Sequence, residues 1–319
     1  MQQAICSLFD LYLSRSDLRP LSVEFKRRAL AYFVEWFGDL PIGQVTEAIG
    51  EDYRTLLAKG RSKNTANGYL SNFKPFFRWC HRHGRIAADP FLNVRLYKVS
   101  ERGLNKFDCH ELERLVKVCE TPLSLARLGF GLVGCRRGEM FNIRREDIRL
   151  EDVQPHVLLS AKDDAKDGWE WVTKTHRLRY IALPDVIACG REFLPFHQAV
   201  RECMSISQPY PFVESKYYRH MMDLKAAGKL AASDIADPTG NFQRGFRRLQ
   251  ERAGIRPTKR YHDLRRTFGT AAVARYGLAK ATMALGNATA EITRRHYDVE
   301  SPIAVVAEVS RMAQKCFGT

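Results

Sequence analysis

The sequence predicts a mainly α-helical protein with a small antiparallel β-sheet. Apolar residues recur at helical spacing through the first hundred residues or so, and again from Phe242 onward. Between these regions, three short segments carry aromatic or β-branched residues, at 156–160, 169–174 and 178–183. A chain of 319 residues that is 45% hydrophobic can bury two cores, so we expect two domains of ordinary size.

The first domain, expected at residues 1–98, is predicted to be helical throughout. Gly38 and Pro41 should end its second helix, and Thr46 should cap its third. Pro75 should either kink the fourth helix or start a new segment. The helical segments are expected around 5–12, 30–37, 46–57 and 64–83.

A linker at 99–104 should lead to the second domain at 105–319. Asp108 and Glu111 have the spacing of a capping box, which predicts a helix start directly after the linker. The second and third strand segments are separated by only 175–177, which is short enough for a hairpin turn.

The charge balance points to a polyanionic partner. The chain has 51 Lys and Arg against 36 Asp and Glu, a net charge of +15. A basic protein without such a partner is the alternative on charge alone.

One window, from Tyr53 to Ile86, contains no acidic residue. Its Lys and Arg side chains suit phosphate oxygens, and neutral donors lie among them. A solvated helix face is the alternative. The residues expected to contact nucleic acid are Arg54, Lys59, Arg61, Lys63, Asn64, Thr65, Lys74 and Arg78.

Cysteine usage and hydropathy bound the setting. The eight cysteines form no CxxC pair, so a structural zinc site is not expected, and scattered thiols suit the cytoplasm. No apolar run is long enough to span a membrane, and the N-terminus does not have the pattern of a signal peptide. We therefore expect a cytoplasmic protein.

Two motifs each place an arginine beside a second functional group. Arg136 and Glu139 are i, i+3 neighbours, so the carboxylate could hold the guanidinium toward an anion. A surface ion pair is the alternative for this motif. His262 and Arg265 share one helix face, while Leu264 lies on the other side and should be buried. Such a face could present a phosphate clamp beside a proton acceptor.

A third motif is Leu285-Gly286-Asn287, followed ten residues later by Tyr297. A tyrosine beside basic residues could be an ordinary surface aromatic. In this order and at these intervals, however, the three motifs resemble the tyrosine recombinase (phage integrase) family. The family pattern is Gly-Leu-Arg-x-x-Glu, a hairpin lysine, His-x-Leu-Arg-x-Thr, Leu-Gly-His and a tyrosine. The resemblance covers residues 105–319, and the basic helical segment before them is similar to the family's core-binding domain.

The resemblance implies a role for each matching residue. Arg136 and Arg265 match the catalytic arginines, and Tyr297 matches the nucleophile. Two departures stand out, since Asn287 replaces the usual His or Trp and Tyr297 lies one residue beyond the commonest spacing. Asn can still donate a hydrogen bond to phosphate but cannot shuttle a proton. The remaining matches are Glu139 as the acidic companion of the first arginine, Lys174 as the hairpin lysine five residues before Arg179, and His262 as the partner of Arg265.

The resemblance further implies an enzyme that cleaves and rejoins double-stranded DNA at specific sites. The expected intermediate is a 3′-phosphotyrosyl link, with no cofactor and no metal. It also implies a homotetramer on two DNA sites, in which the segment after Tyr297, from Ser301, docks on a neighbouring copy. Two alternatives stay open: a type IB topoisomerase that relaxes DNA, and a DNA-binding relic weakened by Asn287.

Overall fold

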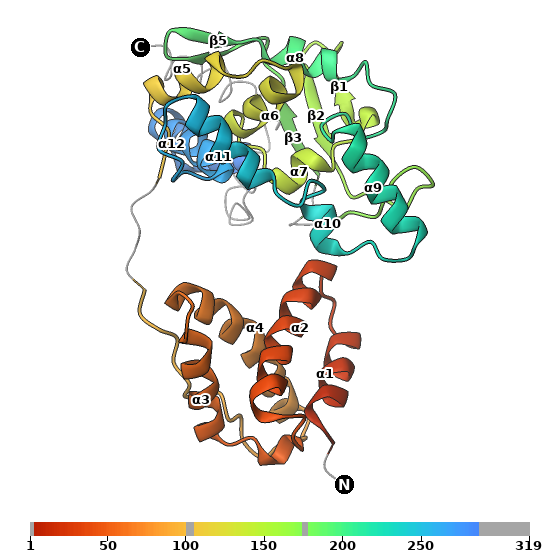
Figure 1. Cartoon of the computed structure of the whole chain (residues 1–319), viewed down its shortest axis with the longest axis vertical. Helices are drawn as coiled ribbons and strands as arrows, with labels where there is room; N and C mark the ends of the chain where they lie inside the picture. Colours follow the sequence, from red (N-terminus) through yellow and green to blue (C-terminus); the bar gives the residue numbers. More distant parts are fainter. Residues whose placement is uncertain (1–2, 100–104, 174–177, 287–319) are drawn as a thin grey trace. The chain divides into compact units, whose positions relative to one another are not determined.

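A computed structural model describes residues 3–99, 105–173 and 178–286. The chain divides into two compact units, Met1–Gly103 and Leu104–Thr319, and each has its own hydrophobic core (Figure 1). Within the described residues, no helix combines the length and the hydropathy that crossing a membrane requires.

The first unit consists of helices, as predicted. The Thr46 hydroxyl accepts a hydrogen bond from the Ile49 amide at 3.3 Å, which is the expected N-cap. Pro75 neither ends the fourth helix nor divides it, since buried residues on both sides of it hold the helix in the core. The elements are α1 (Ile5–Ser14), α2 (Pro20–Phe37), η1 (Ile42–Gln44), α3 (Glu47–Ala58) and α4 (Lys63–Arg82).

An aromatic cluster holds these helices together. Phe73 of α4 lies at its centre, and the Tyr53 hydroxyl of α3 donates to the Ala29 carbonyl of α2 at 2.7 Å. One face of α4 is therefore committed to the core, and the other is left to solvent. The rings within 6.2 Å of the Phe73 ring, measured between centroids, are Phe9, Phe33, Tyr53, Phe76, Phe77 and Phe91.

The second unit is mostly helical around two small sheets. Its first helix begins with the predicted capping box, in which the Glu111 amide donates to Asp108 at 2.8 Å and the Asp108 amide donates to Glu111 at 2.9 Å. The elements are α5 (Cys109–Lys117), α6 (Pro122–Leu132), α7 (Arg137–Phe141), η2 (Arg145–Asp147), β1 (Ile148–Arg149), β2 (His156–Leu159), β3 (Arg179–Ala182), β4 (Ile187–Cys189), β5 (Glu192–Leu194), α8 (Phe196–Cys203), α9 (Ser215–Ala226), α10 (Ala232–Ala236), α11 (Phe242–Arg252) and α12 (Tyr261–Leu285).

Both sheets are antiparallel, which confirms the predicted fold class. The larger has the order β1-β2-β3, with Val157 of β2 between Ile148 of β1 and Ile181 of β3, and the smaller pairs β4 with β5. The first and third predicted strand segments are therefore direct partners.

The predicted strand at 169–174 is wrong. Among its described residues, Trp171 makes one isolated bridge to Lys162 and no strand forms. The Trp169 ring instead stacks on Tyr210, with centroids 4.0 Å apart, and its indole donates to the Asn142 side chain at 2.7 Å. Burying this large side chain with its polar group satisfied takes the segment out of the sheet.

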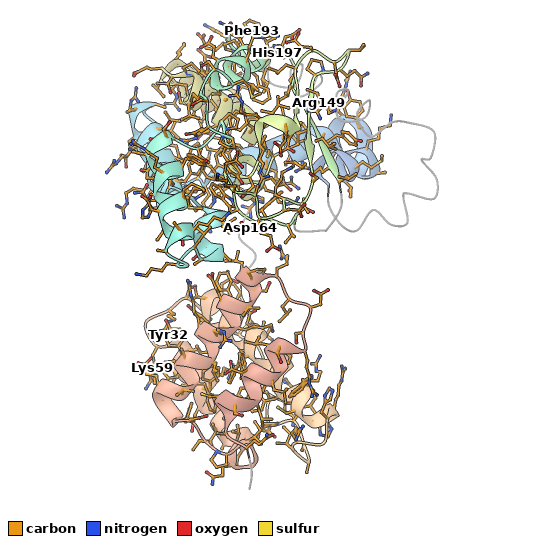
Figure 2. All side chains as sticks on the ribbon, turned by 90° about the vertical axis from the view of Figure 1, so that its right-hand side faces the viewer. Tyr32, Lys59, Arg149, Asp164, Phe193 and His197 are labelled. Carbon is orange, nitrogen blue, oxygen red and sulfur yellow. The ribbon has the colours of Figure 1, made fainter. Side chains whose placement is uncertain are left out.

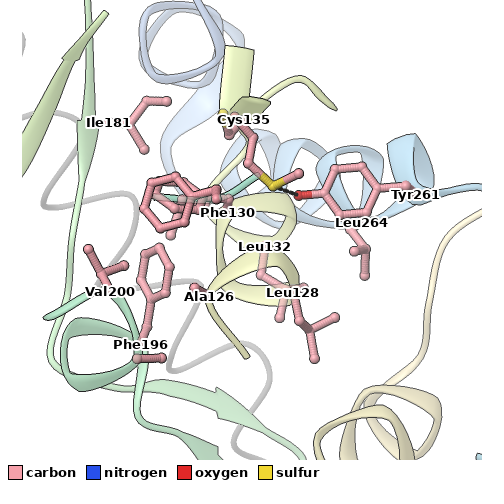
Figure 3. Close-up of a cluster of buried hydrophobic side chains, with 14 of the residues drawn as sticks. Ala126, Leu128, Phe130, Leu132, Cys135, Ile181, Phe196, Val200, Tyr261 and Leu264 are labelled. Carbon is pink, nitrogen blue, oxygen red and sulfur yellow. Dashed lines mark hydrogen bonds between the residues drawn. The ribbon is translucent and has the colours of Figure 1, made fainter. Parts of the chain in front are cut away.

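The core of the second unit forms around α6. Figure 3 shows Phe130 of α6 against Phe196, with Leu264 and Tyr261 of α12 on another side of that helix. The Tyr261 hydroxyl donates to the Arg127 carbonyl at 2.6 Å, and this hydrogen bond connects the first turn of α12 to α6.

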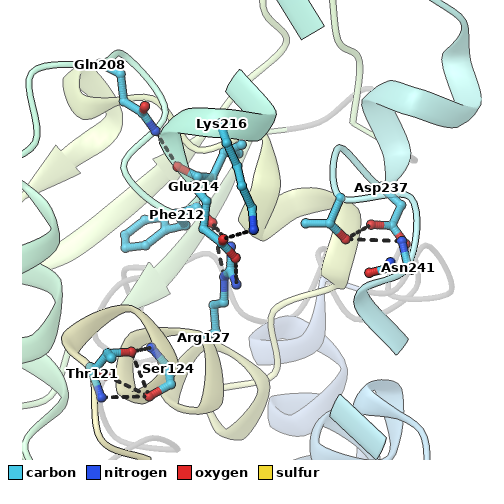
Figure 4. Close-up of polar contacts among 11 residues, drawn as sticks. Thr121, Ser124, Arg127, Gln208, Phe212, Glu214, Lys216, Asp237 and Asn241 are labelled. Atoms are coloured by element: carbon cyan, nitrogen blue, oxygen red, sulfur yellow. Dashed lines mark hydrogen bonds and ion pairs between the residues drawn. The ribbon is translucent and has the colours of Figure 1, made fainter. Parts of the chain in front are cut away.

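The outer end of the Arg127 side chain belongs to a separate polar cluster (Figure 4). Its guanidinium donates to the Phe212 carbonyl at 2.9 Å and pairs with Glu214 at 3.3 Å. This arginine therefore joins α6 to the segment that precedes α9.

Candidate active site

Arg136 and Glu139 form the predicted pair at the start of α7. The Arg136 guanidinium donates to Glu139 Oε1 at 2.5 Å, and the Arg136 backbone amide donates to Oε2 at 2.8 Å. Glu139 is only 4% exposed, so the alternative of a surface ion pair is wrong.

A third arginine, Arg179, completes the surroundings of Glu139. It opens β3, is buried, and forms an ion pair with Glu139 Oε2. Its Nη2 also donates to the carbonyls of Gly134 at 2.9 Å and Ala284 at 3.1 Å. Sequence reasoning used Arg179 only to place Lys174. The signal it missed is a charged residue within the apolar strand segment 178–183.

Arg265 reaches the same place from α12. It is buried, and its guanidinium donates to the Gly134 carbonyl and, at 2.6 Å, to the Leu285 carbonyl. Gly134 has φ +80°, and a Cβ there would lie 2.7 Å from the Phe268 ring. Only glycine therefore lets this turn approach α12 closely enough for its carbonyl to meet Arg265.

The three arginines meet at the C-terminal end of α12. The last carbonyls of a helix have no partner within it and carry partial negative charge, so guanidinium groups stabilise them. Each of three successive carbonyls accepts from a different arginine: Ala284 from Arg179 at 3.1 Å, Leu285 from Arg265 at 2.6 Å, and Gly286 from Arg136 at 3.2 Å.

The cluster of Arg136, Arg179, Arg265 and Glu139 carries excess positive charge. It contains three guanidinium groups and one carboxylate, and Glu139 pairs with Arg136 and Arg179. Burial, followed by the charges of Arg179 and Arg136, lowers the pKa of Arg265 to about 9. A site of this kind favours an anion.

His262 lies in the first turn of α12, one turn before Arg265, and its side chain reaches the surface. Partial desolvation of the ring, followed by the positive charges of Arg265 and Arg266, lowers the pKa of His262 below its ordinary value of 6.5. The imidazole is therefore neutral near pH 7 and can accept a proton.

Three of the predicted site residues, Lys174, Asn287 and Tyr297, lie outside the described residues. Gly286, directly before Asn287, packs against Arg179 and accepts from Arg136. The described chain thus enters the segment that carries Asn287 and Tyr297 at the arginine cluster itself.

The predicted nucleic-acid residues of the first unit fall into two groups. Three of them make internal contacts: the Arg54 guanidinium lies 4.0 Å from the Tyr97 ring, Arg61 lies 4.4 Å from the Tyr32 ring, and Lys74 donates to a backbone carbonyl at 2.6 Å. Figure 2 shows Tyr32 and Lys59 on the same side of the unit. The exposed group is Lys59, Lys63, Asn64, Thr65 and Arg78.

Replacing Glu139 by Gln should destabilise the second unit because Arg136 and Arg179 would lose their counter-ion. We expect the free energy of unfolding to fall by about 3 kcal/mol near pH 7. Burial alone would raise the pKa of Glu139, but Arg179 and Arg136 outweigh burial and bring it below 4.5. The wild-type advantage is therefore complete above pH 4.5 and is lost as the pH falls through the folded-state pKa.

Urea denaturation of both proteins at about pH 7 and about pH 3 measures this difference. Glu120→Gln is the control, because Glu120 pairs with Arg252 at the surface and should contribute less than about 1 kcal/mol. An equal loss for Glu139→Gln at both pH values would contradict the role of the carboxylate charge.

No protein-family model matches this chain. Over 140 residues the chain is 25% identical to the tyrosine recombinase XerC of Oceanobacillus iheyensis (strain DSM 14371 / CIP 107618 / JCM 11309 / KCTC 3954 / HTE831). That match covers 40% of this chain and 46% of XerC, so it spans about half the length of that relative.

Solved integrase structures share the fold across nearly the whole chain. The Tn1549 transposon integrase in complex with a circular intermediate DNA matches with a TM-score of 0.64 at 16% identity, covering 96% of this chain and 98% of that one. A lambda integrase (75–356) dimer bound to a COC′ core site matches with a TM-score of 0.62 at 15% identity, covering 91% and 97%. A lambda integrase tetramer bound to a Holliday junction matches with a TM-score of 0.61 at 16% identity, covering 89% and 77%. The chain therefore has the fold of these integrases, and part of its sequence is similar to a tyrosine recombinase.

Proposed function

We propose that this protein is a site-specific DNA recombinase that cleaves and rejoins double-stranded DNA to integrate or excise a mobile element. The observation that carries the proposal is the convergence of Arg136 and Arg265, from distant segments, at the end of α12. That end leads directly into the segment that contains Asn287 and Tyr297. Two guanidinium groups beside a tyrosine-bearing segment suit attack on a phosphodiester.

The proposed reaction begins with attack of the Tyr297 phenol oxygen on a backbone phosphorus. Arg136 and Arg265 bind the non-bridging oxygens and stabilise the charge that develops on them. His262 accepts the phenol proton, and Lys174 gives a proton to the departing 5′ oxygen. Asn287 donates a hydrogen bond to the same phosphate through its amide.

The bond to tyrosine replaces the bond to the 5′ oxygen, so the products are a 3′-phosphotyrosyl link and a free 5′ hydroxyl. A 5′ hydroxyl from another strand can attack that link and release Tyr297. One phosphoester is exchanged for another at each step, and the reaction therefore needs no ATP and no metal.

The first unit would supply DNA affinity through its exposed residues on α4 and near it. Lys59, Lys63 and Arg78 have no acidic residue in their stretch of sequence, which suits contact with phosphates. Recombination between two duplexes needs four cleavages, and we propose a homotetramer in which the segment from Ser301 docks on a neighbouring copy. The lambda integrase tetramer on a Holliday junction supports this assembly by fold similarity.

Tyr297→Phe should abolish covalent attachment to DNA and leave DNA affinity nearly unchanged, because one hydroxyl adds little to binding. The substrate is a library of nicked duplexes with randomised sequence around the nick, from which the denaturant-resistant adducts of the wild type are recovered and sequenced. The selected duplex then serves to compare the two proteins in gel-shift and trapping assays. Adduct formation by the Phe variant at the wild-type rate would exclude Tyr297 as the nucleophile.

Cleavage should decrease on acidification because His262 must be neutral to accept the proton. The pKa of His262 lies below 6.5. The single-turnover rate should therefore be constant above pH 6.5 and should fall as the pH drops through the pKa of His262. In His262→Gln we expect a lower rate without this acidic limb. An unchanged limb in the variant would assign the titration to another group.

Lys63→Ala should weaken DNA binding and lower its salt dependence, since removing one phosphate interaction reduces the slope of log K against log salt by about 1. Fluorescence anisotropy across a salt series measures the slope. Arg27→Ala is the matched control, because Arg27 is an exposed residue of the same unit that pairs with Asp10. Equal slopes for the Lys63 variant and the wild type would remove Lys63 from the interface.

A further inference from the structure

We infer that Arg179 is a positioning residue of the proposed active site, which holds Glu139 and the end of α12 in the arrangement that orients Arg136 and Arg265. The inference rests on the proposed function and adds a residue that the motifs do not include. It is argued from the contacts of the Arg179 side chain, which join three segments distant in sequence.

The Arg179 guanidinium donates hydrogen bonds to the Glu139 carboxylate and to two backbone carbonyls. Its Nη1 pairs with Glu139 Oε2, while Nη2 donates to the carbonyls of Gly134 and Ala284. Without Arg179, Glu139 Oε2 would keep only the Arg136 amide among the partners described above. The carboxylate that orients the Arg136 guanidinium would then be without its second counter-ion.

The stem of Arg179 also sets how closely α12 approaches β3. Gly286 has φ +60°, and a Cβ there would lie 2.6 Å from Arg179 Cδ and 2.7 Å from Nε. The backbone directly before Asn287 therefore rests on the Arg179 side chain. A change at Arg179 would shift the carbonyls of Leu285 and Gly286, which hold Arg265 and Arg136.

Arg179 acts through these groups and does not bind the phosphate itself. Its side chain is 8% exposed, against 21% for Arg136, and the described contacts turn both terminal nitrogens toward protein acceptors. Lys at this position would keep the charge but offer one nitrogen in place of a planar fork. It could not serve Glu139 and both carbonyls in the same geometry.

The test compares wild type, Arg179→Lys, Arg179→Met and the control Arg127→Met on the trapped duplex. Arg127 suits the control because it is a largely buried arginine of the same unit whose guanidinium bonds to Phe212 and Glu214, away from the cluster. Thermal melting establishes which variants are folded, gel shift gives the dissociation constant, and single-turnover trapping gives the cleavage rate.

A misplacement of catalytic groups by about 1 Å costs about 100-fold in rate, so we expect a loss of that size for Arg179→Met with DNA affinity within about twofold of wild type. Arg179→Lys should recover part of the rate, and Arg127→Met should cleave at the wild-type rate once folded. Adding Glu139→Gln to Arg179→Met should cause no further large loss, because both changes act on Arg136.

Wild-type cleavage by both folded Arg179 variants would overturn the inference and leave the proposed function standing. A rate loss in Arg127→Met as large as that in Arg179→Met would also overturn it, since the effect would then follow from general destabilisation. If Arg179→Met does not fold, the Arg179→Lys variant provides the test. A lower cleavage rate than wild type with unchanged DNA affinity would support a positioning role for Arg179. Absence of any adduct with the wild type would instead reject the proposed function.

Discussion

A carboxylate can be buried in protein only if positive charges and hydrogen bonds surround it. Glu139 meets this condition with Arg136 from its own turn and Arg179 from β3, which joins the start of α7 to the sheet. Because α7 and β3 come from separate parts of the chain, the pair can form only when the second unit is fully folded. The arrangement of the arginine cluster is thus tied to the stability of the whole unit.

The same constraint explains why the cluster suits an anion. One carboxylate cannot neutralise three guanidinium groups, and the carbonyls at the end of α12 supply only partial charges. Arg179 pairs with Glu139 and holds Ala284, whereas Arg265 and Arg136 hold the last two carbonyls of the described chain. The two arginines nearest the end of the helix are therefore the ones that a substrate would meet.

The sequence was sufficient for features that depend on local chemistry. The caps at Thr46 and Asp108 follow from side-chain spacing, and so does the Arg136–Glu139 pair, although Arg136 is the N-cap of α7 and not a residue of the helix. Features that depend on tertiary contacts could not be predicted this way. Trp169 lies in a β-prone segment, but its stacking on Tyr210 removed the expected strand.

Arg179 was missed for a related reason. Its partners Gly134, Glu139 and Ala284 lie between 40 and 105 positions away in the sequence, and hydrophobic periodicity cannot identify contacts at that separation. In the first unit, Arg54 and Lys74 likewise looked available for nucleic acid, but their contacts with Tyr97 and Val94 were not visible in the sequence.

The end of α12 also has a consequence for a substrate that enters the proposed site. A guanidinium has five N–H groups, more than the carbonyls of Gly286 and Leu285 take from Arg136 and Arg265. A phosphate could therefore bind both arginines while these carbonyls stay in place. The C-terminus of α12 would then keep one position before and after the proposed substrate binds, because Arg179 also holds Ala284.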